Sequence, residues 1–433
     1  MLLRFRATNF ASLRDEQELS LMALDEHPDV ITTTVPLVGE RALPAIGIFG
    51  ANASGKSNVL KAVEFARSAV IGSHQLWLPE DPIPRWPFRL DTTSRTEPSA
   101  FAFDFVQDDV RYEYVFSLDD RVIREETLRY WPRGKVRVLF ERTGTEISFG
   151  PSLTGHKSAI AEIVRENSLF LSAAAANNHP QLRPIANWFN RLRWASDYAA
   201  SPRDELDHRM LALMKYADIG VIGSMKINRQ AVVTGRETYF VDVPGQEPLF
   251  TFDPSDDLGL PQLRRSLNRI LEGGYVHLTH QAEGDRGEPL PWPWESSGTR
   301  SWLKLAADAS RVLDDGLILI VDDLGSNLHP LLTAQLLGMF QSPRTNPHHA
   351  QLIFTGHDAS LLGRHVEHRL HRDQVWLTAK DQNGATTLYP LTEYGRVRDG
   401  LDDIEGRYLQ GRYGAVPFFD KEALREAAFG ERE

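Results

Sequence analysis

Residues 50–57, Gly-Ala-Asn-Ala-Ser-Gly-Lys-Ser, decide the fold class of this 433-residue chain. They fit the pattern Gly-x-x-x-x-Gly-Lys-Ser/Thr, in which backbone N–H groups wrap a phosphate. The apolar run 45–49 before them predicts a strand, and apolar residues at helical spacing follow from Val59 to Ala66. This order of strand, glycine-rich loop and helix predicts a P-loop at a helix N-terminus.

The types of residue in this loop predict their roles. Lys56 would bring a full positive charge to the β- and γ-phosphates of a nucleotide, and Ser57 would offer a hydroxyl to Mg²⁺. A glycine-rich turn that contains a lysine by chance is the alternative, and the flanking strand and helix disfavour it. The predicted nucleotide-binding residues of the loop are Gly50, Ala51, Asn52, Ala53, Ser54, Gly55, Lys56 and Ser57.

A second carboxylate-bearing strand is expected because a P-loop shares its metal ion with an acid on another strand. The apolar run 317–321 ends in Asp322 and Asp323, and the carboxyl end of a parallel strand faces the ligand crevice. Asp322 would hold Mg²⁺, and Asp323 would orient or deprotonate the attacking water. Paired acids that merely end a strand before the turn at Gly325 are the alternative.

Two further segments carry weaker signals. Residues 295–300, Glu-Ser-Ser-Gly-Thr-Arg, open a predicted helix whose N–H groups could face an anion, although an ordinary helix cap has the same composition. The run 352–355 predicts a strand, and His357 just beyond it could contact a γ-phosphate oxygen. A lone histidine is more often a surface or packing residue, but its position after the two acids favours the functional reading.

Composition limits the remaining classes of function. With 48 Lys and Arg against 59 Asp and Glu, the net charge is −11, which argues against indiscriminate coating of nucleic acid. The chain has 0 Cys and no apolar run that could span a membrane, so we expect a cytoplasmic protein without membrane contact. Basic and aromatic clusters at 129–142, 183–194 and 364–372 leave DNA binding possible, although solvated faces over a buried aromatic side are favoured for each.

The pattern along the chain predicts an α/β fold: a P-loop NTPase with a mixed parallel sheet, an antiparallel β meander over 99–150 and a compact α/β insertion. We expect three parts. They are an N-terminal ATPase lobe at 1–155, a compact helical and strand insertion at 156–290, and a C-terminal ATPase lobe with a tail at 291–433. The apolar run 169–171 predicts a strand, and 253–264 a loop.

These pieces together resemble the ABC-type ATPase clan, in particular its RecF, SMC and OLD-like branch. GANASGKSN at 50–58 resembles the P-loop of that branch, and LRFRATNFASLRDEQELSL at 3–21 its N-terminal hairpin. ESSGT at 295–299 resembles the signature motif, LILIVDDLGSNLHP at 317–330 the Walker B strand and following loop, and LIFTGHD at 352–358 the switch histidine. The tail YLQGRYGAVPF resembles the ATP-binding proteins of RloA and AbiLi type, which are linked to bacterial abortive infection.

The resemblance implies a head-to-tail homodimer. ATP on the P-loop of one subunit, with Asn58 added to the binding residues, would be capped by Ser296, Ser297 and Gly298 of the other. Two departures from the family pattern stand out: Asp323 occupies the usual position of a glutamate, which favours slow hydrolysis, and Ala11 replaces a frequent basic residue, for which Arg14 is a possible substitute. The candidates for the glutamine of the Q-loop are Gln75 and Gln107.

The family resemblance leaves three functions open. The favoured one is a Mg²⁺-dependent ATPase that regulates a separate effector, a nuclease or toxin, in a prokaryotic defence system. No nuclease module is recognisable in the residues after His357, so the effector chemistry would belong to a partner. The alternatives are a RecF-like DNA-repair clamp ATPase and an ATP-binding scaffold with little turnover.

Overall fold

The computed structural model describes residues 1–27, 29–36, 39–195, 206, 208–217, 220–227, 230–234, 237–241, 251–252, 275–283, 287–290, 292–395, 403–417 and 425. The chain forms two compact units, one of Met1–Ala195 with Ala309–Glu433 and one of Ser196–Asp308. The insertion expected at 156–290 therefore differs from the second unit at both ends. The expected loop at 253–264 lies outside the described residues.

A six-stranded sheet forms the centre of the first unit, in the order β11-β18-β19-β5-β20-β21. All neighbouring pairs are parallel except β20 with β21. Every residue of β5 is buried, which is typical of a parallel strand covered on both faces. The strands are β5 (Ala45–Gly50), β11 (Leu192–Trp194), β18 (Ile318–Val321), β19 (Gln351–Gly356), β20 (Val375–Lys380) and β21 (Thr386–Pro390).

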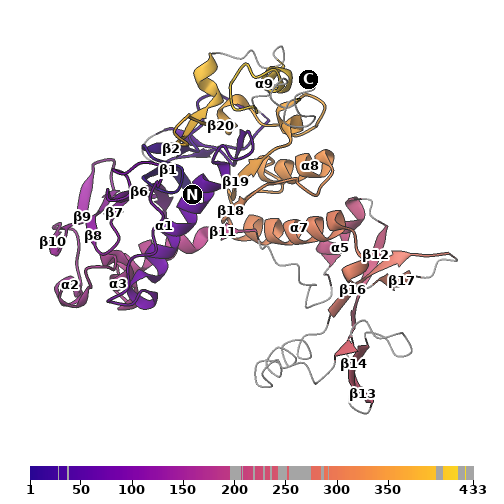
Figure 1. The fold of residues 1–433 in the computed structure, drawn as a ribbon, viewed down its shortest axis with the longest axis horizontal. Coiled ribbons are helices and arrows are strands. Elements are labelled where there is room, and N and C mark those ends of the chain that lie inside the picture. Colours follow the sequence, from indigo (N-terminus) through magenta and orange to yellow (C-terminus); the bar gives the residue numbers. More distant parts are fainter. Residues whose placement is uncertain are drawn as a thin grey trace, which may run out of the picture. The chain divides into compact units, whose positions relative to one another are not determined.

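The second large sheet of this unit is antiparallel and contains the expected meander, so the mixed α/β fold class is confirmed. Its order is β10-β9-β8-β7-β6-β1-β2, which places the N-terminal hairpin beside the meander (Figure 1). The strands are β1 (Leu2–Thr8), β2 (Gln17–Ser20), β6 (Ser99–Gln107), β7 (Val110–Leu118), β8 (Ile123–Trp131), β9 (Arg137–Thr143) and β10 (Glu146–Phe149).

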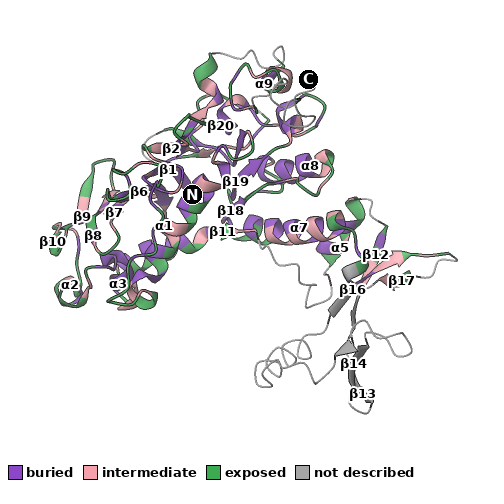
Figure 2. Cartoon of the chain, in the orientation of Figure 1, coloured by how far each residue is buried: buried purple, intermediate pink, exposed green. Residues whose placement is uncertain are grey.

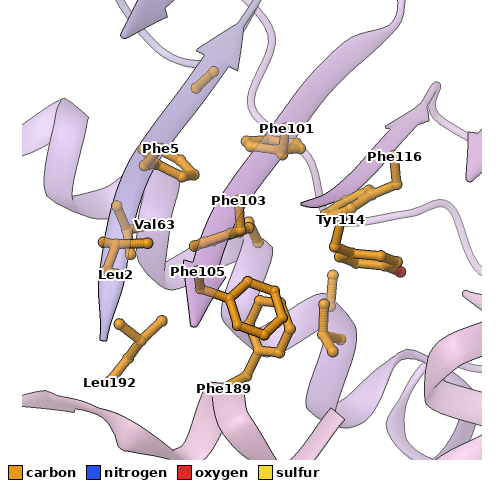
Figure 3. Packing of buried hydrophobic residues seen from close by; sticks show 14 of the residues in the cluster. Leu2, Phe5, Val63, Phe101, Phe103, Phe105, Tyr114, Phe116, Phe189 and Leu192 are labelled. Carbon is orange, nitrogen blue, oxygen red and sulfur yellow. The ribbon is translucent and has the colours of Figure 1, made fainter. Parts of the chain in front are cut away.

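One hydrophobic core joins the two sheets through helix α1 (Lys56–Leu76). In Figure 3, Phe5 of β1 and Phe103 of β6 lie next to each other with their rings tilted, and Val63 of α1 lies beside Leu2. The ring centroids of Phe5 and Phe103 are 4.8 Å apart, within the range of favourable aromatic pairs. Because α1 begins at the P-loop, this packing fixes the direction from which the helix meets the nucleotide site.

The other helices of the first unit cover the sheets, and their inner faces are buried (Figure 2). They are α2 (Lys157–Ile163), α3 (Phe170–Ala176), α4 (Leu182–Trp188), η1 (Phe189–Arg191), α8 (Pro330–Gln341), η3 (Ala359–Leu362), η4 (Arg372–Gln374), η5 (Leu391–Tyr394) and α9 (Ile404–Leu409), with the short strands β3 (Thr33–Thr34) and β4 (Arg41–Ala42). The strand expected at 169–171 is wrong, because α3 begins there. None of the helices in the described ranges is both long and apolar enough to span a bilayer.

The second unit contains two three-stranded sheets, β12-β16-β17 and β13-β14-β15. Its strands are β12 (Val221–Ile227), β13 (Gln230–Thr234), β14 (Glu237–Val241), β15 (Thr251–Phe252), β16 (Tyr275–Gln281) and β17 (Gly287–Leu290). Its helices are α5 (His208–Tyr216), η2 (Trp292–Trp294) and α7 (Ser297–Asp315), whose last residues belong to the first unit. The Trp302 indole N–H donates to the carbonyl of Leu213 at 3.0 Å, which joins α7 to α5.

Candidate functional site

The loop between β5 and α1 has the tight course that a phosphate-wrapping loop needs. Gly55 has φ 108°, a left-handed conformation that side chains rarely adopt. A Cβ at Gly50 would lie 2.6 Å from the carbonyl oxygen of Thr378. Both glycines are therefore required by the backbone, and together they let the chain reverse directly into the first turn of α1.

Lys56 is buried at the mouth of this loop. Its Nζ donates to the carbonyl oxygens of Gly50 at 2.8 Å and Ala51 at 3.0 Å. Burial lowers the pKa of Lys56, and the nearby charges of Asp323 and Asp322 oppose that shift. The ammonium thus has hydrogen-bond partners within its own loop that phosphate oxygens could replace.

The acid pair after β18 reaches the P-loop through the serine that the sequence predicts. Ser57 Oγ donates to Asp322 Oδ1 at 2.9 Å, across 265 residues of sequence. Thr355 Oγ1, at the end of β19, donates to the same carboxylate oxygen at 2.6 Å and accepts from the backbone N–H of Asp323 at 2.7 Å. Thr355 therefore fixes the side chain of one acid and the backbone of the other.

Asp323 and His357 lie at the open side of this arrangement. Asp323 has φ 58°, a left-handed conformation that aspartate tolerates better than most residues. The side chains are about half exposed, and His357 Nε2 lies 3.9 Å from Asp323 Oδ1. That separation is too long for a direct hydrogen bond and leaves both groups accessible to a water molecule or a ligand.

A cavity of about 500 Å³ collects these residues. Its lining comprises Asn52, Ala53, Gly55, Lys56, Ser57, Asn58, Asp322, Asp323, Thr355, His357 and Lys380. Gly50, Ala51 and Ser54 belong to the same loop but do not line the cavity. A second cavity, of about 850 Å³, lies between the loop at 79–82 and residues 165–167 and contains none of the predicted site residues.

Thr355 and Lys380 are lining residues that the sequence analysis missed. Thr355 is a buried hydroxyl two positions before His357, directly after the apolar residues 352–354 of the strand, which is a usable signal. Lys380 ends β20, the strand beside β5, so the rule that ligands bind at the carboxyl ends of parallel strands would have found it once that strand order was known.

The predicted signature residues lie in the second unit, at the start of α7. Ser296 caps the helix: its Oγ accepts from the backbone N–H of Thr299 at 3.0 Å and lies 2.8 Å from Thr299 Oγ1. Ser296 and Ser297 are exposed, and Gly298 is half-buried. Buried Glu295 lies 2.8 Å from His280 Nε2, which ties this helix start to β16. The segment thus presents an exposed helix N-terminus.

Three other expected residues do not reach the cavity. Gln75 is exposed on α1, and Gln107 ends β6, where its Nε2 donates to the carbonyl of Pro184 at 3.2 Å. Neither lines the cavity, so neither can act there as the Q-loop glutamine in this conformation. The guanidinium of Arg14 is paired with Asp15 at 2.9 Å.

The residues present fit a nucleoside triphosphate with Mg²⁺. The two required glycines and the buried ammonium suit phosphate groups, while the Ser57 hydroxyl and Asp322 are the few protein ligands that Mg²⁺ takes when phosphates and water complete its shell. No three His, Cys, Asp or Glu side chains cluster as a metal site within the ranges that the structure describes.

The fold and this site together define a P-loop NTPase domain. Residues 46–363 match the family described as "AAA domain, putative AbiEii toxin, Type IV TA system", and the chain belongs to this family. It is also similar to the SMC head domain from Thermotoga maritima, with 10% sequence identity, coverage of 90% of this chain and 98% of that chain, and a TM-score of 0.39. No curated protein matches the sequence.

Proposed function

We propose that this protein is a Mg²⁺-dependent ATPase that hydrolyses the β–γ phosphoanhydride of ATP. The observation that carries the proposal is the meeting of Lys56, Ser57, Asp322, Asp323 and His357 at one cavity, although they come from opposite ends of the sequence. A structural turn or a surface acid pair would not require all five at the same place.

Each side chain has a distinct task in this reaction. Ser57 and Asp322 would hold Mg²⁺, which neutralises charge on the phosphates when bound. Lys56 would exchange its two loop carbonyls for phosphate oxygens. Asp323 would orient a water molecule and accept its proton, and His357 would donate a hydrogen bond to the γ-phosphate. Because aspartate is shorter than glutamate, the water would be held less well and turnover would be slow.

The wider role that we propose is regulation in a cytoplasmic prokaryotic defence system. The description of the matched family names a toxin of a toxin–antitoxin system, which supports this setting. ATP would join two copies of the chain, with the P-loop of one facing the exposed start of α7 of the other. A separate nuclease or toxin would respond to that dimer.

Phosphate release with MgATP tests the enzymatic step. Lys56→Ala should lose nucleotide binding, and Asp323→Asn should keep binding but reduce turnover by about 100-fold or more. Lys61→Ala, an exposed lysine on the same helix, should behave like the wild type. A wild-type rate equal to that of Lys56→Ala would refute hydrolysis. If the wild type then still binds nucleotide and Lys56→Ala does not, the result would favour the ATP-binding scaffold.

A further inference from the structure

Next to the P-loop, four buried hydroxyls that do not line the cavity come together from distant parts of the chain. They belong to Ser12 in the N-terminal hairpin, Ser54 in the P-loop, Thr378 in β20 and Thr386 in β21. Ser12 Oγ lies 2.7 Å from Thr386 Oγ1, and Ser54 Oγ lies 2.6 Å from Thr378 Oγ1. None of these contacts takes part in the reaction proposed above.

Counting protons gives the first set of hydrogen bonds a direction. Thr386 Oγ1 donates its only proton to the carbonyl oxygen of Ser54 at 2.8 Å, so it must accept from Ser12. Ser12 Oγ in turn accepts from Asn58 Nδ2 at 2.7 Å. The hydrogen bonds therefore run from Asn58 through Ser12 and Thr386 to the backbone of Ser54, and both ends lie in the nucleotide-binding segment. We call this set the Ser12–Thr386 relay.

The last bond of the relay acts on one peptide group. A trans peptide is planar, so its C=O and N–H point in opposite directions. With the carbonyl oxygen of Ser54 held toward Thr386, the N–H of Gly55 points the other way, toward the cavity that Gly55 lines. A P-loop binds phosphate through such N–H groups, and their value depends on where they point.

We propose that Thr386 is a positioning residue for phosphate binding, which acts through the carbonyl of Ser54 to aim the N–H of Gly55, and that Ser12 orients Thr386. The proposal rests on the proposed function, because it assigns the relay to the same nucleotide site. Buried hydroxyls with complete partners also stabilise a fold, so the test needs a readout that stability alone does not move.

The test compares nucleotide affinity among threonine variants of β21, with fluorescent ADP and Mg²⁺ as the probe and each variant held well below its melting temperature. Thr386→Val should weaken binding about tenfold, because the N–H of Gly55 is no longer held toward a charged phosphate. Thr386→Ser should restore the affinity. Thr387→Val, on the exposed side of the same strand, should bind like the wild type. In turnover, Thr386→Val should raise KM and leave kcat nearly unchanged.

Ser12→Ala supplies an independent arm if Thr386→Val does not fold. It should weaken binding several-fold, and in a foldable double variant it should add nothing to the effect of Thr386→Val, because both act through one relay. Unchanged affinity in Thr386→Val or Ser12→Ala, while Lys56→Ala abolishes binding, would overturn the relay alone. If the wild type and Lys56→Ala bind the probe equally, the nucleotide site itself is wrong.

Discussion

Thr355 holds both acids that follow β18. Its hydroxyl donates to Asp322 and accepts from the backbone of Asp323, so it sets the side chain that would hold the metal ion and the backbone that carries the proton acceptor. Asp323 sits in a left-handed conformation, which surrounding contacts help to maintain. Thr355 supplies one of those contacts.

Replacing Thr355 should therefore affect the chemical step more than binding. Thr355→Val keeps the volume but removes the hydroxyl, and we expect phosphate release to fall by about 100-fold, because a displacement of about 1 Å at a catalytic group has that effect. Affinity for MgADP should change little. Thr355→Ser is the matched control and should retain most of the rate. Equal rates for the valine variant and the wild type would show that the acids are held by other contacts.

Lys56 gives the site an expected dependence on pH. Burial lowers the pKa of its amine, so the ammonium loses its proton at a lower pH than an ordinary lysine. Only the charged form attracts phosphate strongly, and affinity should fall as pH rises through that lowered pKa. Titration of MgADP binding from neutral pH up to about 10.4, where an ordinary lysine titrates, measures the fall. Lys56→Ala should bind weakly at every pH, and a flat wild-type profile would contradict the assignment.

At this scale the sequence reveals residues in motifs and misses residues whose role depends on neighbours. Lys56, Ser57 and Asp322 stand in local patterns whose chemistry is legible without a structure. Thr386 stands in no motif, and its partners Ser12 and Ser54 become visible only when β20 and β21 are placed beside the P-loop. Hydrogen bonds between distant strand ends are set by strand order, which a single sequence encodes only indirectly.

Among the elements, α3 shows how a buried side chain overrides a local pattern. The apolar run at 169–171 is compatible with a strand, but Glu126 of β8 accepts from the backbone N–H groups of Phe170 at 2.6 Å and Leu171 at 2.9 Å. Those N–H groups belong to the first turn of a helix, where N–H groups have no acceptor within the helix. The Glu126 carboxylate supplies the missing acceptors, and the alanines that follow favour continuation of the helix.

Glu126 should accordingly be one of the most sensitive positions for stability. Burial raises its pKa, and Arg142 opposes that shift from 3.8 Å. Glu126→Ala would remove the counter-charge of buried Arg142 and the acceptor of two backbone N–H groups. We therefore expect the free energy of unfolding in urea to drop by about 3–5 kcal/mol. The exposed neighbour gives the control: Glu125→Ala should stay within about 0.5 kcal/mol of wild type. Similar losses in both variants would refute this role.

The antiparallel sheet bears on the question of DNA. Arg129, in the basic segment 129–142, lies 3.3 Å from Glu113 and 3.6 Å from Glu141, and Arg6 of β1 also pairs with Glu113. Exposed arginines that alternate with acids across strands make a solvated sheet face. A surface that binds the phosphate backbone of DNA needs an excess of positive charge. The pairing with acids removes that excess at these positions.

For the whole molecule, the proposed ATP-bound dimer has a direct mass readout. One chain has a mass of 48.9 kDa, and Asp323→Asn with MgATP should elute at about twice that value in light scattering, because bound ATP is not consumed. Ser297→Arg should stay monomeric yet bind nucleotide, since the added side chain occupies the exposed start of α7. Gln281→Arg, an exposed position elsewhere in the second unit, should still dimerise. Dimerisation that does not depend on ATP, or that also occurs in Ser297→Arg, would contradict the proposed ATP-bound dimer.

The two-unit organisation was harder to foresee than the fold class. Alternating strands and helices at both ends of the sequence identify a shared parallel sheet, because β5 and β18 are unbroken apolar runs. The spacing of apolar residues does not show at which residues the second unit begins and ends. Helices α3, α4 and η1 pack on α1, and β11 pairs with β18, so the first unit extends to Ala195, although the sequence analysis assigns these residues to the insertion.

The position of β5 between β19 and β20 also governs when the protein can become functional during its synthesis. Phe49 and its hydrogen-bond partner Thr378 are 329 residues apart, so translation at ordinary rates leaves the P-loop strand without either neighbour for tens of seconds. A nascent chain that stops early lacks Asp322, His357 and the far side of the relay. An incomplete chain therefore lacks part of the proposed nucleotide site until nearly its last strand has emerged.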